Sequence, residues 1–478
     1  MKTLPAVLWA GIVLTFVLAA CRPAAPAELG TPAALAVLPV VTQTPSSTPA
    51  APTPTPFRPL LPTLYLSPTP SVTPTPHPFA AVEARGDVLA AMPEVSAQET
   101  INIILIGADR RGGGRYFRTD TLIIAILRPN QQSVSLLSIP RDLYVNIPTV
   151  GMNRINTAYL EGERGKYPGG GPALLAETIR YNLGVRIDHH VLVDFKGFRE
   201  IIDGLGGVDV RVACPYTDWH IINPNLSEEL ESNWQLATVG PGIVRMDGAE
   251  ALWYARSRMK SSDFDRGRRQ QDVLRAIFAR VLQPDWLARA PELYQSFSGS
   301  VTTDLTFADI LTAMPYLARL QAPQIRSYYI FRGMTTAYTT SGGAAVLLPQ
   351  PDRIRNIVQK ALAPPDARDE TRLATQVEIW NLTPFAGWDE LAAERLNYAG
   401  YAAFVGAAQP GVFPAQTPTL LIDLTAAGDV QRNANLLADL GLPTSRLLVQ
   451  PDPSRTAQYL LVLGADYNPC FEPHKLTH

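Results

Sequence analysis

The sequence INIILIG, residues 101–107, predicts a buried β-strand, because a short run of β-branched and other apolar residues bounded by glycine is typical of one. Asp109 and Arg110 follow at its end. Two further apolar runs, residues 121–127 and 133–139, predict two more strands. The sequence therefore indicates a sheet whose first strand ends in charged residues.

Charged residues also stand at one end of each of the other two strands. Arg118 and Asp120 precede the second strand, and residues two apart on an extended chain point to the same side. Arg141 and Asp142 follow the third strand. For a single such residue a surface ion pair, which contributes about 0–1 kcal/mol, is the simpler interpretation. Because the charges recur at successive strand ends, we expect them to form one site.

A second charged stretch lies much later in the chain. Asp247 and Glu250, three residues apart, form a variant of the capping box and predict a helix that begins near Gly248. Arg256 and Arg258 would point in roughly opposite directions on a helix but in the same direction on extended chain. We therefore expect this helix to end near residue 254.

The next helix is predicted to run from about Asp265 to about Leu282. By the spacing of three, four and seven, one stripe of this helix contains Arg266, Arg269, Gln270, Val273 and Ile277. Its first turn thus presents cations where its later turns present core residues. A helix N-terminus disfavours arginine by up to about 1 kcal/mol, and a bound anion would reverse the sign of this effect.

Together these charges predict a phosphate site. Arginine suits bidentate contacts with phosphate, at about 1.5–3 kcal/mol per charged hydrogen bond. Asp109 and Asp120 add two carboxylates, and Mg²⁺ is typically held by one or two carboxylates while phosphate oxygens and water complete its shell. The residue types therefore predict a diphosphate bridged by Mg²⁺.

Seven separated motifs occur in the same order as in a known family. They are IGADRR, FRTDTLIIAIL, SLLSIPRDLYVNIP, NRINTAYLEG, IIDGLGGVDV, MDGAEALWYARSR and DFDRGRRQQDVL. Over about residues 101–282 the chain resembles the LytR-CpsA-Psr family of cell-wall glycopolymer ligases. The resemblance implies a phosphotransferase that moves a glycopolymer from a polyprenyl diphosphate carrier to peptidoglycan. It also implies an α/β fold, with a three-layer α/β/α catalytic domain, a mixed central sheet and an apolar tunnel for the lipid.

The resemblance also implies a role for each matching residue. Asp109 and Asp120 take the place of the family's Mg²⁺-linked carboxylates, and Asp109 and Arg141 are the expected catalytic residues. The expected diphosphate-binding residues are Arg118, Arg141, Arg256, Arg258, Arg269 and the neighbouring polar Gln270. Asp265 and Arg266 belong to the DFDRGRRQ motif without an assigned role, and Asp142 is interpreted as an ion-pair partner that orients Arg141.

A second resemblance lies further along the chain. VEIWNLTPFAGWDELAAERL, residues 377–396, and YLLVLGADY, residues 459–467, resemble the C-terminal domain often appended to this family. Because this segment does not combine charges as the first domain does, we interpret it as a smaller α/β module for interaction or positioning. We expect the catalytic domain to span residues 99–362 and the C-terminal domain residues 373–468, with the boundary in APPDARDETR, residues 363–372.

The N-terminal segment predicts export and anchoring. A largely apolar run, residues 4–20, is too short to span a bilayer and ends in small residues, which predicts a signal peptide over residues 1–20. Cys21 after Leu-Ala-Ala resembles a lipobox and implies lipid on its sulfur, with a plain signal peptide or an uncleaved anchor as the alternative. Residues 21–98 are rich in proline and threonine and predict an extended tether. We therefore expect an extracytoplasmic lipoprotein at the outer face of the cytoplasmic membrane.

Composition excludes several other classes of protein. At a net charge of −2 the chain has no global basic field of the kind that favours nucleic acid. No Walker A pattern, Ser-His-Asp order or zinc spacing of histidines is present. With Cys21 assigned to lipid, Cys214 and Cys470 remain, one in each expected domain. A disulfide between the domains is chemically allowed outside the cell, but we expect two uncoupled thiols.

The leading hypothesis is Mg²⁺-assisted transfer of a glycopolymer to a sugar hydroxyl of peptidoglycan, with Asp109 activating that hydroxyl. Hydrolysis of the polyprenyl diphosphate, with water as acceptor, is the second enzymatic hypothesis. A non-catalytic scaffold that binds the lipid carrier or the cell wall is the third.

Overall fold

The computed structural model describes residues 100–110, 117–223, 226–227, 229–257, 263–287, 289–297, 299–409, 411–414, 416–426 and 428–470. All of them belong to one compact unit of the chain. The predicted signal peptide, Cys21 and the linker lie outside the described residues, as does Arg258. Among the helices of the described ranges, none combines the length and the apolar character needed to cross a bilayer.

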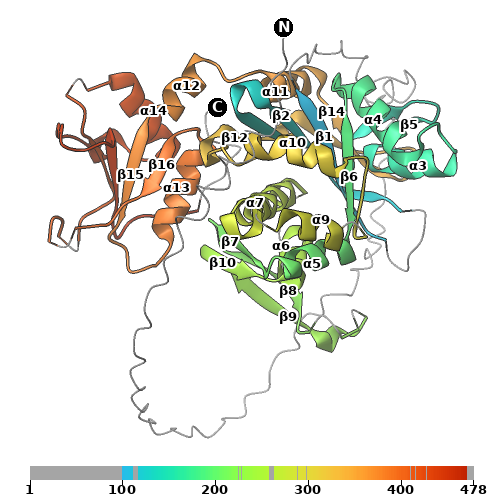
Figure 1. Ribbon diagram of the computed structural model, residues 1–478, viewed down its shortest axis with the longest axis horizontal. Helices are drawn as coiled ribbons and strands as arrows, with labels where there is room; N and C mark the ends of the chain where they lie inside the picture. The colour runs from blue at the N-terminus through green and yellow to red at the C-terminus, as the bar shows by residue number, and fades with distance from the viewer. Residues whose placement is uncertain are drawn as a thin grey trace, which may run out of the picture. The chain divides into compact units, whose positions relative to one another are not determined.

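A mixed six-stranded sheet forms the centre of the first part of the chain (Figure 1). Its strands, in spatial order, are β11 (Val301–Thr303), β6 (His189–Asp194), β1 (Ile101–Ala108), β2 (Thr119–Arg128), β3 (Ser133–Ser138) and β12 (Ile325–Tyr329). β2 pairs antiparallel with both β1 and β3, whereas β6 is parallel to β1 and β12 is parallel to β3. The three strands predicted from their apolar runs are therefore the three central strands.

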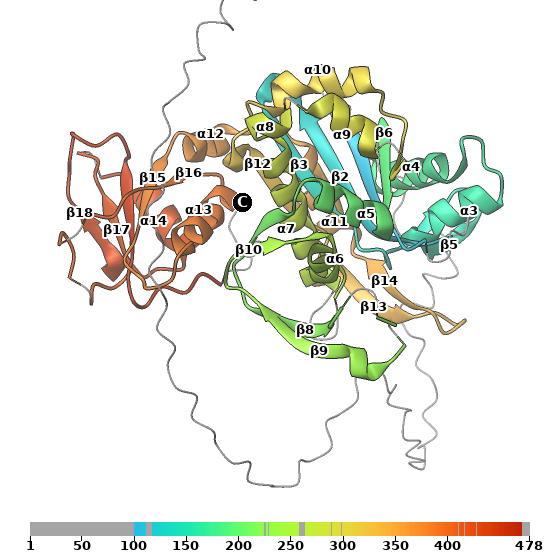
Figure 2. The same ribbon diagram turned by 60° about the horizontal axis from the view of Figure 1, so that its bottom comes forward.

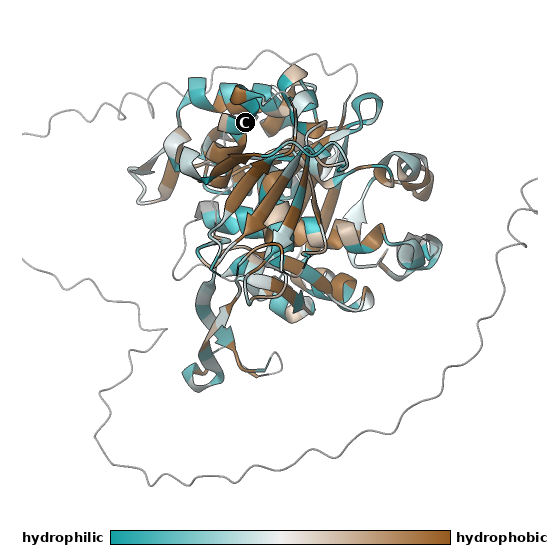
Figure 3. Cartoon of the chain, turned by 90° about the vertical axis from the view of Figure 1, so that its left-hand side faces the viewer, coloured by the Kyte–Doolittle hydropathy of each residue, from teal (hydrophilic) through white to brown (hydrophobic). Residues whose placement is uncertain are grey.

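Side-chain alternation along these strands gives the sheet two apolar faces. On β2, Leu122, Ile124 and Ile126 face one core, and Ile123, Ala125 and Leu127 face another. The first core contains residues of α4 (Gly170–Leu183) and α11 (Pro351–Leu362), and the second contains residues of α7 (Asp263–Val281) and α10 (Phe307–Leu317). The strands of this sheet are hydrophobic along most of their length (Figure 3). Because helices cover both faces, the predicted three-layer α/β/α fold with a mixed sheet is confirmed (Figure 2).

The remaining elements of this part surround the sheet. The other helices are α3 (Ala158–Arg164), α5 (Phe195–Gly204), α6 (Gly248–Arg256), α8 (Pro284–Leu287) and α9 (Ala290–Phe297). Four antiparallel strand pairs complete it: β4 (Tyr144–Ile147) with β5 (Gly151–Arg154), β7 (Val208–Val212) with β10 (Gly242–Met246), β8 (Tyr216–Ile221) with β9 (Trp234–Val239), and β13 (Thr335–Thr339) with β14 (Ala345–Pro349).

A separate five-stranded sheet lies in the C-terminal part. Its order is β16 (Ala402–Val405), β15 (Gln376–Asn381), β19 (Tyr459–Leu463), β17 (Leu420–Asp423) and β18 (Leu447–Val449). With α13 (Trp388–Tyr398) and α14 (Val430–Leu440) it encloses its own apolar core. The expected boundary segment, residues 363–372, forms most of α12 (Ala367–Leu373), which Asp366 caps. The division into two domains stays a prediction.

Two helix ends differ from those expected from the sequence. α6 continues to Arg256 instead of ending near residue 254, because the N–H of Ser257 still donates to the carbonyl of Trp253. α7 begins at Asp263, two residues before the predicted start. An early end of α6 would place Arg256 and Arg258 on extended chain, pointing the same way, whereas Arg256 reaches the site from the last turn of the helix.

Cys214 and Cys470 form a disulfide bond, so the prediction of two uncoupled thiols is wrong. Their Cα atoms lie 4.3 Å apart, although 256 residues separate them in the sequence. This proximity depends on how α13 packs against β7 and α7, which no local pattern in the sequence records. The bond therefore ties the segment that follows β7 to the segment that follows β19.

Candidate active site

The strand directions gather the charged residues at one edge of the central sheet. β1, β6, β3 and β12 all end at this edge, because β6 is parallel to β1, β12 is parallel to β3, and β2 runs antiparallel between β1 and β3. β2 begins there. In open α/β sheets, ligands bind beyond the carboxyl ends of the parallel strands. Residues that follow β1, β3 and β6, or precede β2, therefore meet at one place.

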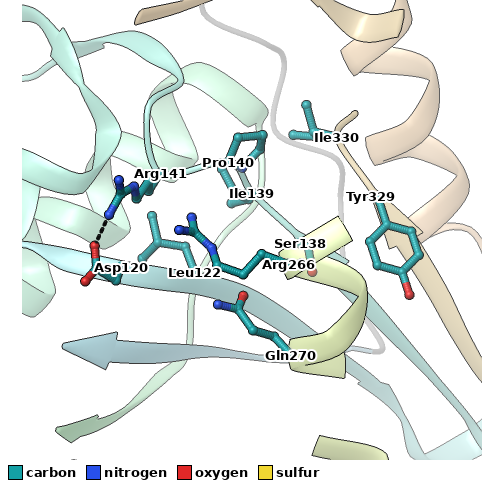
Figure 4. Close-up of a pocket in the computed structure, with 11 residues that line it drawn as sticks. Asp120, Leu122, Ser138, Ile139, Pro140, Arg141, Arg266, Gln270, Tyr329 and Ile330 are labelled. Atoms are coloured by element: carbon teal, nitrogen blue, oxygen red, sulfur yellow. Dashed lines mark hydrogen bonds and ion pairs between the residues drawn. The ribbon is translucent and has the colours of Figure 1, made fainter. Parts of the chain in front are cut away.

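Arg141, three residues after the end of β3, lies at the centre of a chain of ion pairs. Its Nη1 forms a close ion pair with Asp120 at the start of β2, drawn as a dashed line in Figure 4. Its Nε lies 3.4 Å from Asp142, which in turn lies 3.7 Å from Nη1 of Arg154. These side chains are roughly one-fifth to one-third exposed, so solvent screens the pairs only in part. The arrangement fixes the Arg141 guanidinium at the sheet edge.

Backbone hydrogen bonds hold the loop that carries Arg141. The N–H of Asn156 donates to the carbonyl of Arg141, and the Thr119 hydroxyl donates to the carbonyl of Asn156. Both Asn156 and Thr119 are buried. The NRINTAYLEG segment therefore positions Arg141 relative to the beginning of β2.

Arg256 and Asp109 form the second ion pair of the site. Nη2 of Arg256 lies 3.8 Å from Oδ2 of Asp109, which follows β1. The guanidinium stacks over the ring of Phe195, 4.1 Å from its centroid, and Phe195 follows β6 at the same sheet edge. A cation over an aromatic ring gains about 0.5–2 kcal/mol, depending on how far water is excluded. Phe195 therefore holds Arg256 in place.

The predicted capping box sets the start of α6, which delivers Arg256. Asp247 accepts hydrogen bonds from the N–H groups of Ala249 and Glu250, and the Glu250 carboxylate accepts one from the N–H of Asp247. The N–H of Gly248 also donates to Asp203 at the end of α5. These contacts anchor the first turn of α6 against α5, and Arg256 lies in its last turn.

A pocket that is partly open to solvent lies between Arg141 and the first turns of α7 (Figure 4). Arg266 and Gln270 of α7 point into it from one helix face, four residues apart. Arg266 is only 6% exposed. The complete lining is Asp120, Leu122, Ser138, Ile139, Pro140, Arg141, Arg266, Gly267, Gln270, Tyr329 and Ile330. The pocket thus combines two arginines, one carboxylate and an apolar floor.

Arg269 has different surroundings from Arg266. It is 1% exposed, its Nε donates to the carbonyl of Tyr254 at 2.7 Å, and its Nη2 donates to the carbonyl of Ser257. Its guanidinium also lies 4.0 Å from the centroid of the Tyr216 ring. Burial lowers the pKa of this guanidinium. Arg269 therefore holds the C-terminal end of α6, and Arg266 is the arginine of the DFDRGRRQ segment that faces the pocket.

Arg118 is exposed and, among the residues that the structure describes, forms no ion pair. It precedes β2 by one residue, at the same sheet edge as Asp120. Gln270 donates a long hydrogen bond of 3.4 Å to the carbonyl of Ala255. Of the predicted site residues that are described, all except Arg269 are thus at this edge or in the pocket: Asp109, Arg118, Asp120, Arg141, Arg256 and Gln270.

Residues 79–359 match the model of the LytR_cpsA_psr family, which is more than half of the 478-residue chain. The chain belongs to the LytR_cpsA_psr family. The resemblance inferred from seven motifs is thereby confirmed. The family match ends before α12 and leaves the C-terminal sheet outside it.

Named relatives of this family member come from several bacteria. The polyisoprenyl-teichoic acid–peptidoglycan teichoic acid transferase TagU of Oceanobacillus iheyensis is 32% identical over 219 residues, which cover 45% of this chain and 62% of that protein. The regulatory protein MsrR of Staphylococcus aureus is 30% identical over 206 residues, which cover 43% of this chain and 56% of that protein. In both cases this chain spans less than two thirds of the relative's length.

Solved structures of similar proteins include the crystal structure of B. subtilis TagV, which is 25% identical to this LytR_cpsA_psr family member. The match covers 57% of this chain and 98% of TagV, with a TM-score of 0.45. TagT bound to LIIa-WTA is 22% identical, with 56% of this chain and 92% of TagT covered and a TM-score of 0.42.

Three residues of the site were missed in the sequence. Phe195 could have been found, because it follows Asp194 at the end of a strand that ends at the same edge as β1. Arg154 stands in the NRINTAYLEG motif, but nothing local links it to Asp142. Tyr329 reaches the pocket from β12, nearly 190 residues after Arg141, and only the parallel pairing of β12 with β3 brings it there.

Proposed function

We propose that this chain is a phosphotransferase that attaches a glycopolymer, carried on a polyprenyl diphosphate, to peptidoglycan. Family membership and the name of the TagU relative, a teichoic acid transferase, support this proposal. The observation that carries it is the convergence of Arg141, Arg256 and Arg266 with two carboxylates at one sheet edge, beside a pocket with an apolar floor. A diphosphate attached to an apolar chain has the complementary chemistry.

The arginines bind the diphosphate and neutralise its charge. Arg141 and Arg256 are held at the sheet edge by their carboxylate partners and by the Phe195 ring, so both guanidinium groups are already placed where the anion arrives. Arg266 and Gln270 face the same anion from the first turns of α7. The N-terminus of an α-helix favours negative charge, and α7 begins at Asp263, three residues before Arg266.

The reaction exchanges one phosphorus–oxygen bond for another. The acceptor hydroxyl of peptidoglycan forms a bond to the phosphorus that bears the glycopolymer, the bridging phosphorus–oxygen bond breaks, and polyprenyl phosphate leaves. The hydroxyl proton passes to a carboxylate, for which Asp109 is the candidate because it lies beside Arg256 at the mouth of the site. Arginine charge stabilises the leaving phosphate, and such transfers depend chiefly on positioning and electrostatics.

The donor set suits Mg²⁺, which prefers carboxylate oxygens and keeps phosphate oxygens and water as further ligands. Asp109 and Asp120 are the residues that would hold it, and both are partly exposed and already directed toward the site by arginines. The described residues contain no cluster of three or more potential ligands, and two carboxylates suffice for this form of binding. When bound, Mg²⁺ supplies further neutralisation of the diphosphate.

We also propose that a lipid on Cys21 holds the protein at the outer face of the cytoplasmic membrane, where the carrier lipid is found. This follows from the Leu-Ala-Ala-Cys pattern alone. Labelling of the protein with a radioactive fatty acid tests the proposed lipid anchor separately. We expect the label on the wild-type protein and no label on Cys21→Ser.

The test of the transferase uses the full chain with a polyprenyl diphosphate-linked glycopolymer and purified peptidoglycan. We expect Asp109→Ala and Arg141→Ala each to reduce transfer by at least about a hundredfold, the usual consequence of removing a preorganised group that stabilises transition-state charge. Arg180→Ala is the matched control, because Arg180 forms an exposed ion pair with Glu177 on α4, away from the site.

Product analysis with and without peptidoglycan separates transfer from hydrolysis. Release of free glycopolymer phosphate at the same rate in both reactions would establish a hydrolase. Full transfer by both Asp109→Ala and Arg141→Ala, in variants that unfold at the wild-type temperature, would refute the proposed site.

A further inference from the structure

The helix α7 presents a different side of itself to each of four neighbours. Arg266 and Gln270 face the pocket, Leu274 and Phe278 face the central sheet, and Arg269 packs against α6. The fourth side carries Asp272 and Arg275, and it faces α13 of the C-terminal part. Nothing in the proposed reaction uses this fourth side.

Polar contacts connect this side of α7 to α13. The Tyr398 hydroxyl donates to Oδ1 of Asp272 at 2.8 Å, and Arg275 lies 3.8 Å from Glu394. The Arg275 guanidinium also stacks over the Tyr398 ring, 4.2 Å from its centroid. Tyr398 is 2% exposed, and burial raises the pKa of Asp272 while Arg268 lowers it. A hydrogen bond so well shielded from water is directional and difficult to replace.

The same interface extends beyond α7. Arg211 of β7 donates to Glu390 of α13 at 2.9 Å, and Ala213 packs against Tyr398. Nη2 of Arg275 also donates to the carbonyl of Ile325 and to the hydroxyl of Ser327, both in β12. The contacts thus fix α7 between α13 and the strand whose last residue lines the pocket.

The interface lies close to the diphosphate pocket along the helix. Asp272 follows Arg266 by six residues, which is about 9 Å along an α-helix. Tyr329, which lines the pocket, also lies close enough to this side of α7 to interact electrostatically with it. Burial is the larger cause that raises the pKa of Tyr329, and the charge of Asp272 is the next. Because Arg266 and Asp272 lie less than two turns apart on one helix, we expect a displacement of α7 at Asp272 to move Arg266 as well.

We propose that α13 positions the first turns of α7, so that Tyr398 is a positioning residue for Arg266 and Gln270. The C-terminal part then contributes to the site without touching the substrate. Its effect on transfer rests on the proposed function, whereas its effect on α7 does not.

Two tyrosine substitutions test this inference in the full chain. Tyr398→Phe removes only the hydroxyl that bonds Asp272 of α7. Tyr401→Phe is the matched control, because Tyr401 is equally buried and its hydroxyl donates at 3.2 Å to a carboxylate, Asp439, that belongs to α14. Each variant loses one buried hydrogen bond to a carboxylate within the C-terminal part or at its interface.

Amide hydrogen exchange, followed by mass spectrometry, reports the order of α7 directly. We expect Tyr398→Phe to accelerate exchange at the amides of the first turns of α7 and to reduce glycopolymer transfer between about tenfold and a hundredfold, since a misplacement of about 1 Å can cost that much. Tyr401→Phe should leave both at the wild-type level. Asp272→Asn, which keeps an acceptor for the Tyr398 hydroxyl, should retain more of the wild-type exchange protection than Tyr398→Phe.

The inference is overturned if Tyr398→Phe leaves exchange in α7 unchanged, or if Tyr401→Phe accelerates it equally, because the effect would then be general loss of stability. Faster exchange in α7 with unchanged transfer would also overturn it. In a further outcome, the wild-type protein transfers no glycopolymer while Tyr398→Phe, but not Tyr401→Phe, accelerates exchange in α7. In that case the positioning of α7 by α13 is supported and the proposed function fails.

Discussion

Arg266 and Arg269 are three residues apart on α7, yet their replacement should have opposite consequences. Arg266→Ala removes a cation from the pocket, so we expect its main effect to be weak binding of the diphosphate. Arg269→Ala removes two charged hydrogen bonds to the end of α6, at about 1.5–3 kcal/mol each, and should lower the free energy of unfolding by about 3 kcal/mol. Urea unfolding and titration with a polyprenyl diphosphate measure the two effects, and the reverse pattern would show that Arg269 is the ligand.

The sequence could not separate these two arginines. Helical spacing puts both arginines on one stripe of the helix. That stripe is wide enough for Arg266 to face the pocket while Arg269 faces the apolar core. Tyr216, which stacks with Arg269, comes from a strand 53 residues earlier in the chain, so its position depends on tertiary structure. Asp109, Asp120 and Arg141 were predictable, because strand ends are visible in the sequence and strand directions bring them to one edge.

His190 should make stability depend on pH on the acid side. Burial lowers the pKa of its imidazole below the usual 6.5, against smaller opposing influence from Asp304. The unfolded chain therefore binds this proton more readily, and the stability is present above about pH 6.5 and is lost as the pH falls through the folded pKa. We expect His190→Gln to flatten the decline in the free energy of unfolding between about pH 7 and 5. His189→Gln is the neighbouring control, and an equally steep decline in His190→Gln would contradict the assignment.

At the scale of whole elements, the capping box of α6 connects helix stability to the site. Asp247→Ala should cost about 0.5–2 kcal/mol of unfolding free energy, and it should also weaken transfer, because Arg256 lies in the last turn of the same helix. Thr306→Ala removes a capping box from α10, which contributes no residue to the pocket lining. Thermal unfolding should therefore show similar losses for both variants, and a transfer assay should show a loss for Asp247→Ala alone. Equal transfer by both would mean that the cap does not position Arg256.

The elements themselves were largely visible in the sequence. The runs INIILIG and TLIIAIL are buried on both faces of the sheet and so lack polar alternation, and they form β1 and β2 as expected. The predicted end of α6 was wrong, because the prediction rested on the direction in which Arg258 had to point and not on a helix stop signal. Helix ends depend on single backbone hydrogen bonds, such as that from Ser257 to Trp253, which composition does not reveal.

For the whole molecule, the Cys214–Cys470 bond should contribute strongly to stability. It closes a loop of 256 residues, and loop-closure entropy alone gives about 5 kcal/mol as an upper estimate. We expect Cys470→Ser to lower the midpoint of thermal unfolding. The part that contains the six-stranded sheet and the part that contains the five-stranded sheet should then unfold in two separate transitions. A reducing agent should lower the wild-type midpoint to that of the variant and leave the variant unchanged. A single transition at the wild-type temperature in Cys470→Ser would contradict this role.

The packing of the C-terminal part could not be predicted at all. The hydrogen bond between Tyr398 and Asp272 joins residues 126 positions apart in the sequence. Each residue lies on a helix rich in charged residues, so its local sequence does not single it out. Recognition of the C-terminal segment rested on its resemblance to a known domain, which carries no information about the surface that it contacts.

In the resting protein each of two site arginines is already neutralised by an internal carboxylate, Asp120 beside Arg141 and Asp109 beside Arg256. An arriving anion competes with these carboxylates for the same guanidinium groups, and as it succeeds it releases acidic oxygens that can accept a cation. If the site binds a diphosphate and Mg²⁺ as proposed, the two ligands are linked thermodynamically, and each raises the affinity of the other by the same factor. Affinity for the diphosphate should then increase with Mg²⁺ concentration to the same extent that the diphosphate tightens Mg²⁺, a reciprocity that the resting salt links impose on the site.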